Sequence, residues 1–201
     1  MEWYYHSFDP KEPWLRADDR LGRYRDVTLP SGMENWFASD FNPPAAQWKR
    51  GRAPFAAANG ELRIPARASC QLSFCKCADP VHTLWKNDVL LIRGDFEFPP
   101  FEEGYRYRML HAGISHVGSG GGYRLYINGK LFIEDPRAVD RREGARPKGR
   151  VIPKEWWSEF DAGKVSLAAI TFKKTDSGSK LYGGNISFFI QRMKVPPLDA
   201  E

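Results

Sequence analysis

Long apolar runs are absent from this chain. It contains no stretch of eighteen apolar residues, so we expect no membrane-spanning helix and no membrane partner. The first residues, MEWYYHSFDPKEPW, lack the basic and apolar regions of a signal peptide. Internal repeats and low-complexity tails are missing as well, which argues against a repeat protein.

Signatures of catalysis are also scarce. Ser119 lies in a glycine-rich loop, residues 118–122, and not on the strand-to-helix elbow that carries a hydrolase serine. The same loop lacks the Lys-Ser/Thr end of a phosphate-binding loop. Glu102 and Glu103 are adjacent and would point apart, which predicts a solvated turn and not the facing carboxylates of a glycosidase. We therefore expect no catalytic residues, with a hydrolase of unknown type as the alternative.

What the chain does contain favours β-structure. Of its 201 residues 42% are hydrophobic and 14% aromatic, while amphipathic helical periodicity is weak. Aromatic-rich chains punctuated by Gly and Pro favour an all-β sandwich over a helical bundle. Residues 1–60, with Trp36 and Trp48 among many turn residues, are expected to form an irregular wrap around a β-sandwich domain at residues 61–201.

The clearest local signal is a β-hairpin. Asn128-Gly129 separates two alternating segments, and this dipeptide is typical of tight hairpin turns because both positions require φ > 0. Tyr123, Leu125 and Ile127 would share one face of the first strand. Strands are predicted at Leu62–Ile64, Ser69–Phe74, Val89–Phe98, Tyr105–Ala112, Gly122–Ile127, Lys130–Glu134, Val165–Lys173 and Asn185–Lys194.

Two further features concern the backbone. Gly94, inside the Val89–Phe98 strand, indicates a bulge or a close approach to the backbone. Pro153 at the start of residues 153–160 predicts one or two helical turns there.

The positive charge is concentrated in one segment. Residues 136–154 hold seven basic and two acidic residues, so this segment carries the whole formal net charge of +5. Arg141, Arg142 and Arg146 present planar guanidinium groups that match carboxylate or sulfate, which indicates an anionic ligand. A solvated loop with a few surface ion pairs is the alternative.

Aromatic side chains near this segment are candidate contacts for a sugar ring. Trp156 and Trp157 follow it directly, and we expect one of them to be buried and the other exposed. Tyr123 is a further candidate platform, although alternation favours an inward position. His116 precedes the glycine-rich loop, where polar groups converge on ligands; a structural role in the fold is the alternative.

The three cysteines are close together in the sequence. Cys70, Cys75 and Cys77, with His82, supply the four ligands that a structural zinc site needs. A disulfide with one free thiol, or three packed thiols, are the alternatives.

Nucleic acid is an unlikely partner on sequence grounds. The pI near 9.1 and the aromatic content suit single-strand binders, but the cations form one loop and not a stripe. No nucleic-acid-binding motif is present.

Five segments together resemble the galactose-binding-like jelly roll of bacterial carbohydrate-active proteins. They are Leu84-Trp85, Val89–Arg93, Asp95–Pro99, Arg106–Leu110 and Gly122–Lys130. The resemblance implies an all-β jelly-roll sandwich that acts as a non-catalytic carbohydrate-binding or accessory module with a glycan partner. A structural or interdomain module without a glycan ligand is the alternative.

Two upstream segments are similar to an uncharacterised module of large, mostly secreted planctomycete-type bacterial proteins. They are Asp26–Trp36 and Trp48–Phe55. This similarity implies an extracytoplasmic or secreted location and, as partners, other domains of a parent protein. The hairpin also resembles that of protective-antigen-type lectins, which bind calcium through adjacent aspartates. Asp18-Asp19 is the only such pair here and lies far upstream, so the calcium-dependent lectin is the weaker of the two resemblances, and calcium stands beside zinc as a candidate cofactor.

Overall fold

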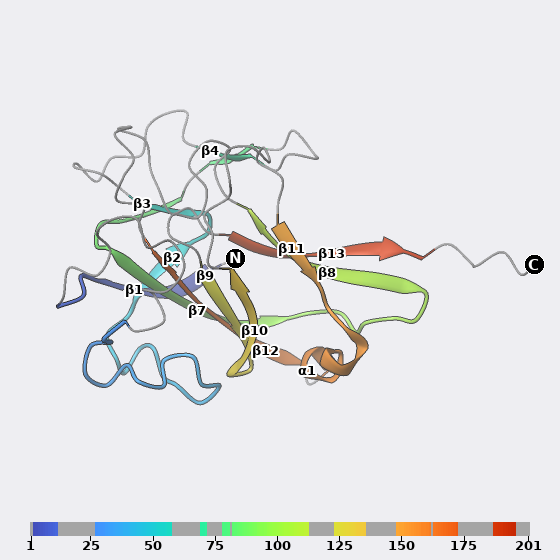
Figure 1. Ribbon diagram of the computed structural model, residues 1–201, viewed down its shortest axis with the longest axis horizontal. Helices are drawn as coiled ribbons and strands as arrows, with labels where there is room; N and C mark the ends of the chain where they lie inside the picture. The colour runs from blue at the N-terminus through green and yellow to red at the C-terminus, as the bar shows by residue number, and fades with distance from the viewer. Residues whose placement is uncertain are drawn as a thin grey trace, which may run out of the picture.

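The computed structural model describes residues 2–11, 27–57, 69–71, 78–80, 82–112, 123–135, 148–161, 163–172 and 187–195. Its elements are almost all strands (Figure 1). In chain order they are β1 (Glu2–Phe8), β2 (Lys49–Arg52), β3 (Phe55–Ala57), β4 (Ser69–Gln71), β5 (Ala78–Pro80), β6 (Thr83–Trp85), β7 (Val89–Glu97), β8 (Tyr105–Ala112), β9 (Tyr123–Ile127), β10 (Lys130–Asp135), β11 (Lys148–Val151), η3 (Lys154–Trp156), α1 (Ser158–Asp161), β12 (Lys164–Phe172) and β13 (Ser187–Lys194). The all-β prediction is confirmed. Neither helix in this part of the chain is long and apolar enough to span a membrane.

Two antiparallel sheets form the body of the protein. The larger has six strands in the order β10-β9-β12-β7-β1-β2, and the smaller has three in the order β11-β8-β13. Two short pairs accompany them, β3 with β6 in parallel and β4 with β5 antiparallel. Figure 1 shows β8 and β13 extending beyond the six-stranded sheet, towards the end where α1 lies.

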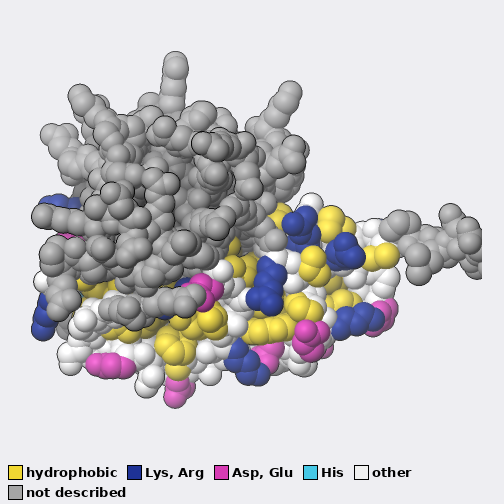
Figure 2. Space-filling view, viewed as in Figure 1, with side chains coloured by type: hydrophobic (Ala, Val, Ile, Leu, Met, Phe, Trp, Pro, Cys, Tyr) yellow, Lys and Arg dark blue, Asp and Glu magenta, His cyan; other side chains and the backbone are white. Residues whose placement is uncertain are grey.

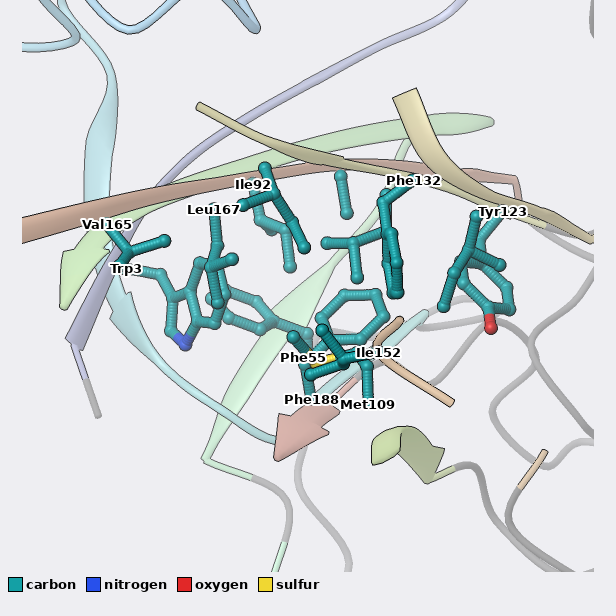
Figure 3. Packing of buried hydrophobic residues seen from close by; sticks show 14 of the residues in the cluster. Trp3, Phe55, Ile92, Met109, Tyr123, Phe132, Ile152, Val165, Leu167 and Phe188 are labelled. Atoms are coloured by element: carbon teal, nitrogen blue, oxygen red, sulfur yellow. The ribbon is translucent and has the colours of Figure 1, made fainter. Parts of the chain in front are cut away.

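The main core fills the space between the two sheets (Figure 3). Alternation along the strands supplies it: Leu90 and Ile92 of β7 and Tyr107 and Met109 of β8 point inward and are at most 4% exposed. Trp3, from β1, is 2% exposed and its ring lies 4.6 Å from that of Phe96. Large side chains contributed by both sheets therefore hold the sandwich together.

A second core covers the opposite face of the six-stranded sheet. Residues 27–48 form a succession of turns that lies over this face. The buried members of this core are Phe8, Met33, Trp36, Trp48, Val89, Leu91, Ala168 and Ile170. The predicted aromatic wrap is thus confirmed for residues 27–48.

A buried arginine joins this wrap to the sheet. Arg93 points from β7 into the second core, is 2% exposed, and donates to the carbonyl oxygens of Trp36, Ala38 and Ser39. Burial lowers the pKa of the guanidinium, and the nearby charge of Asp95 opposes that effect. The group stays charged and ties three backbone carbonyls to one side chain.

The predicted irregularity of residues 1–60 is wrong for β1, β2 and β3, which all lie in this range. β1 lies inside the six-stranded sheet, paired with β7 on one side and β2 on the other. β1 is aromatic on both faces, since Trp3 and Tyr5 join the main core while Tyr4 and Phe8 join the second. A strand covered on both sides shows no alternation in its sequence.

Most predicted strands agree with the structure. β7 to β10, β12 and β13 each lie within two residues of the predicted limits, β4 matches the first part of its prediction, and the Leu62–Ile64 strand lies outside the described residues. The pairing of β7 with β12 runs without a register shift at Gly94, so the bulge is absent there. The close approach is confirmed, because a Cβ at Gly94 would lie 2.5 Å from the Phe96 ring.

The Asn128-Gly129 hairpin has the predicted geometry. The φ angles are 48° at Asn128 and 80° at Gly129, and the burial of β9 alternates as expected. The partner strand β10 contains a bulge: Leu131 pairs with Tyr126 and Ile133 with Leu125, which leaves Phe132 as the extra residue. The bulge turns both Phe132 and Ile133 into the core, where they are 1% and 8% exposed.

Candidate functional site

The structure describes only part of the predicted ligand-binding set. Arg141, Arg142, Arg146 and His116 lie outside the described residues. Tyr123 is 2% exposed, with its ring 5.6 Å from that of Phe188 in the main core, as alternation favours. The side chains that can be placed at the predicted site are Trp156, Trp157 and the cations beside them.

The predicted metal site is mostly outside the described residues. Cys75 and Cys77 lie outside the described residues, and only the backbone of Cys70, in β4, is described. His82 is exposed, and its backbone N–H donates to the Pro54 carbonyl at 3.0 Å. Among the described residues no three His, Cys, Asp or Glu side chains group around a common point. Structural zinc and bound calcium both stay predictions.

Trp156 and Trp157 lie at the end of the sandwich, where Trp156 is the last residue of η3 and Trp157 lies between η3 and α1. The Trp156 ring packs edge-on against Phe132 at 4.8 Å. The Trp157 ring packs edge-on against Phe101 at 5.7 Å and Tyr107 at 5.6 Å. Both tryptophans are half-buried, so the prediction of one buried and one exposed is wrong. Each ring covers part of the core and leaves part of its surface open to solvent.

The turn that carries them is rigidly supported. Phe101 stacks flat on Tyr107 at 3.9 Å and on Phe160 at 4.6 Å, so rings from three segments pack together beneath Trp157. The Tyr107 hydroxyl accepts a hydrogen bond from the backbone N–H of Glu102 at 2.9 Å. Aromatic side chains held in this way lose little conformational entropy when a ligand binds.

Two cations of the 136–154 segment are engaged within the protein. The Arg150 guanidinium lies 5.1 Å from the centre of the Phe132 ring and donates to the Phe132 carbonyl. The Lys154 ammonium lies 5.6 Å from the Trp157 ring and pairs with Glu103 at 2.6 Å. These contacts place positive charge beside Trp157 and beside Phe132, the ring against which Trp156 packs.

Glu102 and Glu103 lie in an exposed turn, as predicted, and point to different partners. Glu102 pairs with Arg192 at 2.6 Å, and the Arg192 guanidinium stacks 3.7 Å from the centre of the Tyr105 ring. The Glu103 and Lys154 side chains are 75% and 68% exposed, so their ion pair contributes at most about 1 kcal/mol to stability. Sequence patterns could not predict the Arg192–Tyr105 stack, because the two residues are far apart in the chain and lie on different strands.

The hairpin turn supports the helical end of the site. The Asn128 side-chain amide donates to the backbone carbonyl and to the carboxylate of Glu159, and its Oδ1 accepts from the Ser166 backbone N–H at 2.8 Å. Lys130 donates to the same carboxylate. Hydrogen bonds from Lys130 and Asn128 lower the pKa of Glu159. The Asn-Gly turn thereby fixes α1, which follows Trp157.

A pH-dependent contribution to stability follows from this contact. Folding lowers the pKa of Glu159. The carboxylate therefore stabilises the folded state above its unfolded pKa near 4.5, and this stabilisation is lost as pH falls through the folded pKa. Glu159→Gln is expected to be less stable than the wild type at pH 7, by up to about 1 kcal/mol, with the difference shrinking below pH 4.5. Urea unfolding at pH 7, 5 and 3 measures it. A difference that stays constant across this range would contradict the role of Glu159.

No family model matches this chain, and no curated protein matches it. Among solved structures it is similar to a calcium-binding mutant of Bacteroides uniformis β-glucuronidase 2, with 11% identity and a TM-score of 0.47, over 94% of this chain and 17% of that one. A glycosyl hydrolase family 2 member from Bacteroides cellulosilyticus gives 14% identity and 0.45, over 96% and 20%. A PA14 sugar-binding domain from an RTX adhesin gives 13% and 0.23, over 58% and 50%. The chain thus spans a fifth or less of these two glycosidases, and their activity belongs to proteins several times its size.

Proposed function

We propose that this protein is a non-catalytic carbohydrate-binding accessory module whose ligand is an anionic glycan. The observation that supports it is the pair of half-buried tryptophans at the end of the sandwich, directly after the cationic segment 136–154. An open indole face can stack on the C–H groups of a sugar ring. The adjacent cations can pair with its carboxylate or sulfate groups.

Rigidity is the second support. Trp156 and Trp157 are anchored by Phe132, Phe101 and Tyr107, so the surface they offer is already ordered before a ligand arrives. In the proposed complex one of these rings stacks on a sugar, and Arg141, Arg142 and Arg146 pair with its anionic substituents. His116, near the glycine-rich loop, is proposed to contribute a polar contact.

The proposal also covers the setting of the protein. It is an accessory part of an extracytoplasmic bacterial protein, in which the glycan is the main partner and other domains of the parent protein are further partners. Its rival is an interdomain module with no glycan ligand, in which the same end of the sandwich packs on a neighbouring domain.

The double substitution Arg141→Ala with Arg142→Ala tests the proposal. Removing two charge-assisted contacts is expected to weaken binding to a uronic or sulfated glycan at least tenfold. Trp156→Leu should also weaken it, because leucine keeps an apolar contact with Phe132 but offers no flat ring. Titration on a glycan array and by calorimetry, at several salt concentrations, measures both effects.

A matched control is available on β2. Lys49 and Arg52 are exposed and lie on the far edge of the six-stranded sheet, so replacing both with alanine removes the same charge elsewhere. If the Arg141/Arg142 variant binds the glycan as tightly as this control does, the proposed site is contradicted. Binding to parent-protein domains without any glycan binding would favour the rival.

A further inference from the structure

The outer face of the three-stranded sheet carries two arginines that the site above does not use. Arg106 and Arg108 alternate on β8 with the inward Tyr107 and Met109, so both point away from the core. Arg106 is exposed and Arg108 half-buried.

The neighbouring strands bring polar and apolar side chains to the same face. Gln191 of β13 and Val151 of β11 lie directly opposite Arg108, one on each side. Met193 lies opposite Arg106. Residues directly opposite each other in an antiparallel pair share a face, so these five side chains form one surface, called here the β8 surface.

Within the part of the chain that the structure describes, no carboxylate balances the β8 surface. Its five members include no acidic residue, and neither Arg106 nor Arg108 forms an ion pair with any residue the structure describes. The nearby carboxylates of Glu102 and Glu103 are already taken by Arg192 and Lys154.

Arg108 also has an unsatisfied donor. Its Nε is buried and has no hydrogen-bond partner. A buried guanidinium N–H without an acceptor is costly, and nothing within the described protein holds this guanidinium in place by a hydrogen bond from Nε. Five other described arginines have acceptors within the protein. Arg50 donates to a tyrosine hydroxyl, Arg93 and Arg150 donate to backbone carbonyls, and Arg124 and Arg192 each pair with a glutamate.

We propose that Arg106 and Arg108, with the Gln191 amide, form a second oxyanion-binding surface for sulfate or carboxylate groups of an anionic polysaccharide. Residues i and i+2 of a strand are about 6.6 Å apart, so each guanidinium can take a separate anionic group of one chain. This inference rests on the proposed function for the identity of the ligand.

Continuity with the cationic segment supports a polysaccharide as the occupant. β11, which flanks Arg108, is part of residues 136–154, so the chain that borders the β8 surface leads directly to Trp156 and Trp157. Figure 2 shows Lys and Arg side chains interspersed with hydrophobic and with Asp or Glu side chains at the end of the molecule where β8, β11 and β13 lie. A flat sheet face can accommodate a long polyanion, whereas extended peptides usually add to a sheet edge or enter a groove.

The test compares Arg106→Gln/Arg108→Gln with the charge-matched control Lys49→Gln/Arg52→Gln, using heparin as the sulfated probe and polygalacturonate as the uronate probe. The β8 variant is expected to bind at least tenfold more weakly than the control. The slope of log affinity against log salt should fall by about one for each contact removed, as counterion release from a polyanion requires. Thermal unfolding of each variant checks that the fold is intact.

A charge-retaining variant separates recognition from packing. Arg108→Lys should recover part of the affinity, since lysine keeps the charge but loses the planar fork. Equal binding by the β8 variant and the control, with wild-type binding intact, would overturn this inference and leave the proposed function standing. Loss in the β8 variant without loss in Arg141→Gln/Arg142→Gln would support the β8 surface and contradict the proposed site.

The two remaining outcomes concern the ligand. If the wild type binds neither probe, the proposed function and the β8 surface are both overturned. If polyglutamate binds as tightly as heparin and loses as much in the β8 variant, the surface recognises an acidic polypeptide, which overturns the assignment of a polysaccharide.

Discussion

Replacing Arg93 with methionine is expected to lower the free energy of unfolding by about 4 kcal/mol. The guanidinium is 2% exposed and donates to the carbonyl oxygens of Trp36, Ala38 and Ser39. Methionine fills a similar volume but donates nothing, so these carbonyls lose a charged donor in a region that water reaches poorly. Much of the loss should appear as loosening of the wrap, residues 27–48.

Urea unfolding measures the global effect, and limited proteolysis within residues 27–48 measures the local one. Arg52→Met is a suitable control, because Arg52 is exposed on the edge strand β2 and should change stability by no more than about 0.5 kcal/mol. Arg93→Lys should recover only part of the loss, since an ammonium cannot present the planar fork. A change of less than 1 kcal/mol in Arg93→Met would contradict the anchoring role.

Phe132→Ala is expected to destabilise the protein by a similar amount, about 4 kcal/mol. Phe132 is the extra residue of the β10 bulge, 1% exposed, and it supports Trp156 through its ring and Arg150 through its ring and its carbonyl. Removing the ring leaves a cavity beneath the tryptophan turn. The substitution should therefore weaken glycan binding as well as stability.

Urea unfolding gives the stability change, and a red shift in tryptophan emission would report that Trp156 has become more exposed. The adjacent Leu131→Ala provides the control: Leu131 is 47% exposed, so the loss should stay below about 1 kcal/mol with no emission shift. Equal effects of the two substitutions would show that the bulge does not direct Phe132 into the core in the way described.

Strands with one covered face could be predicted from the sequence. β9 alternates between buried and half-buried residues, and its limits were recovered within one residue. The Asn128-Gly129 turn was also recoverable, because its backbone requires φ > 0 at both positions and few residue pairs accept that. Both signals depend only on residues close together in the chain.

Strands covered on both faces were harder to recognise. β1 has aromatic side chains in both cores, and the first six residues of β7 are all buried, so neither shows period-two alternation there. β7 was still predicted, because its run of Val, Leu and Ile is typical of a buried strand. β1, with His6 and Ser7 between its aromatic residues, has no such run, so the sequence places it in the irregular wrap.

The candidate site shows the same division. The cationic segment 136–154 and the tryptophans after it stand out in the sequence, because counting charges along the chain finds them. Arg106 and Arg108 did not stand out, since the acidic residues at positions 102 and 103 balance them locally. Only the pairing of β8 with β11 and β13 places these arginines on a face where the described residues include no carboxylate, while Glu102 and Glu103 pair elsewhere.

The sequence by itself determined the all-β class, the hairpin and the single cationic segment. Alternation, turn chemistry and local charge depend on neighbours along the chain, and those are visible in one dimension. Only the tertiary structure decided that residues 27–48 cover a second core, that Arg93 anchors them, and that both tryptophans are half-buried. These properties depend on which distant segment covers each face of a strand, and that is settled when the sheets pack.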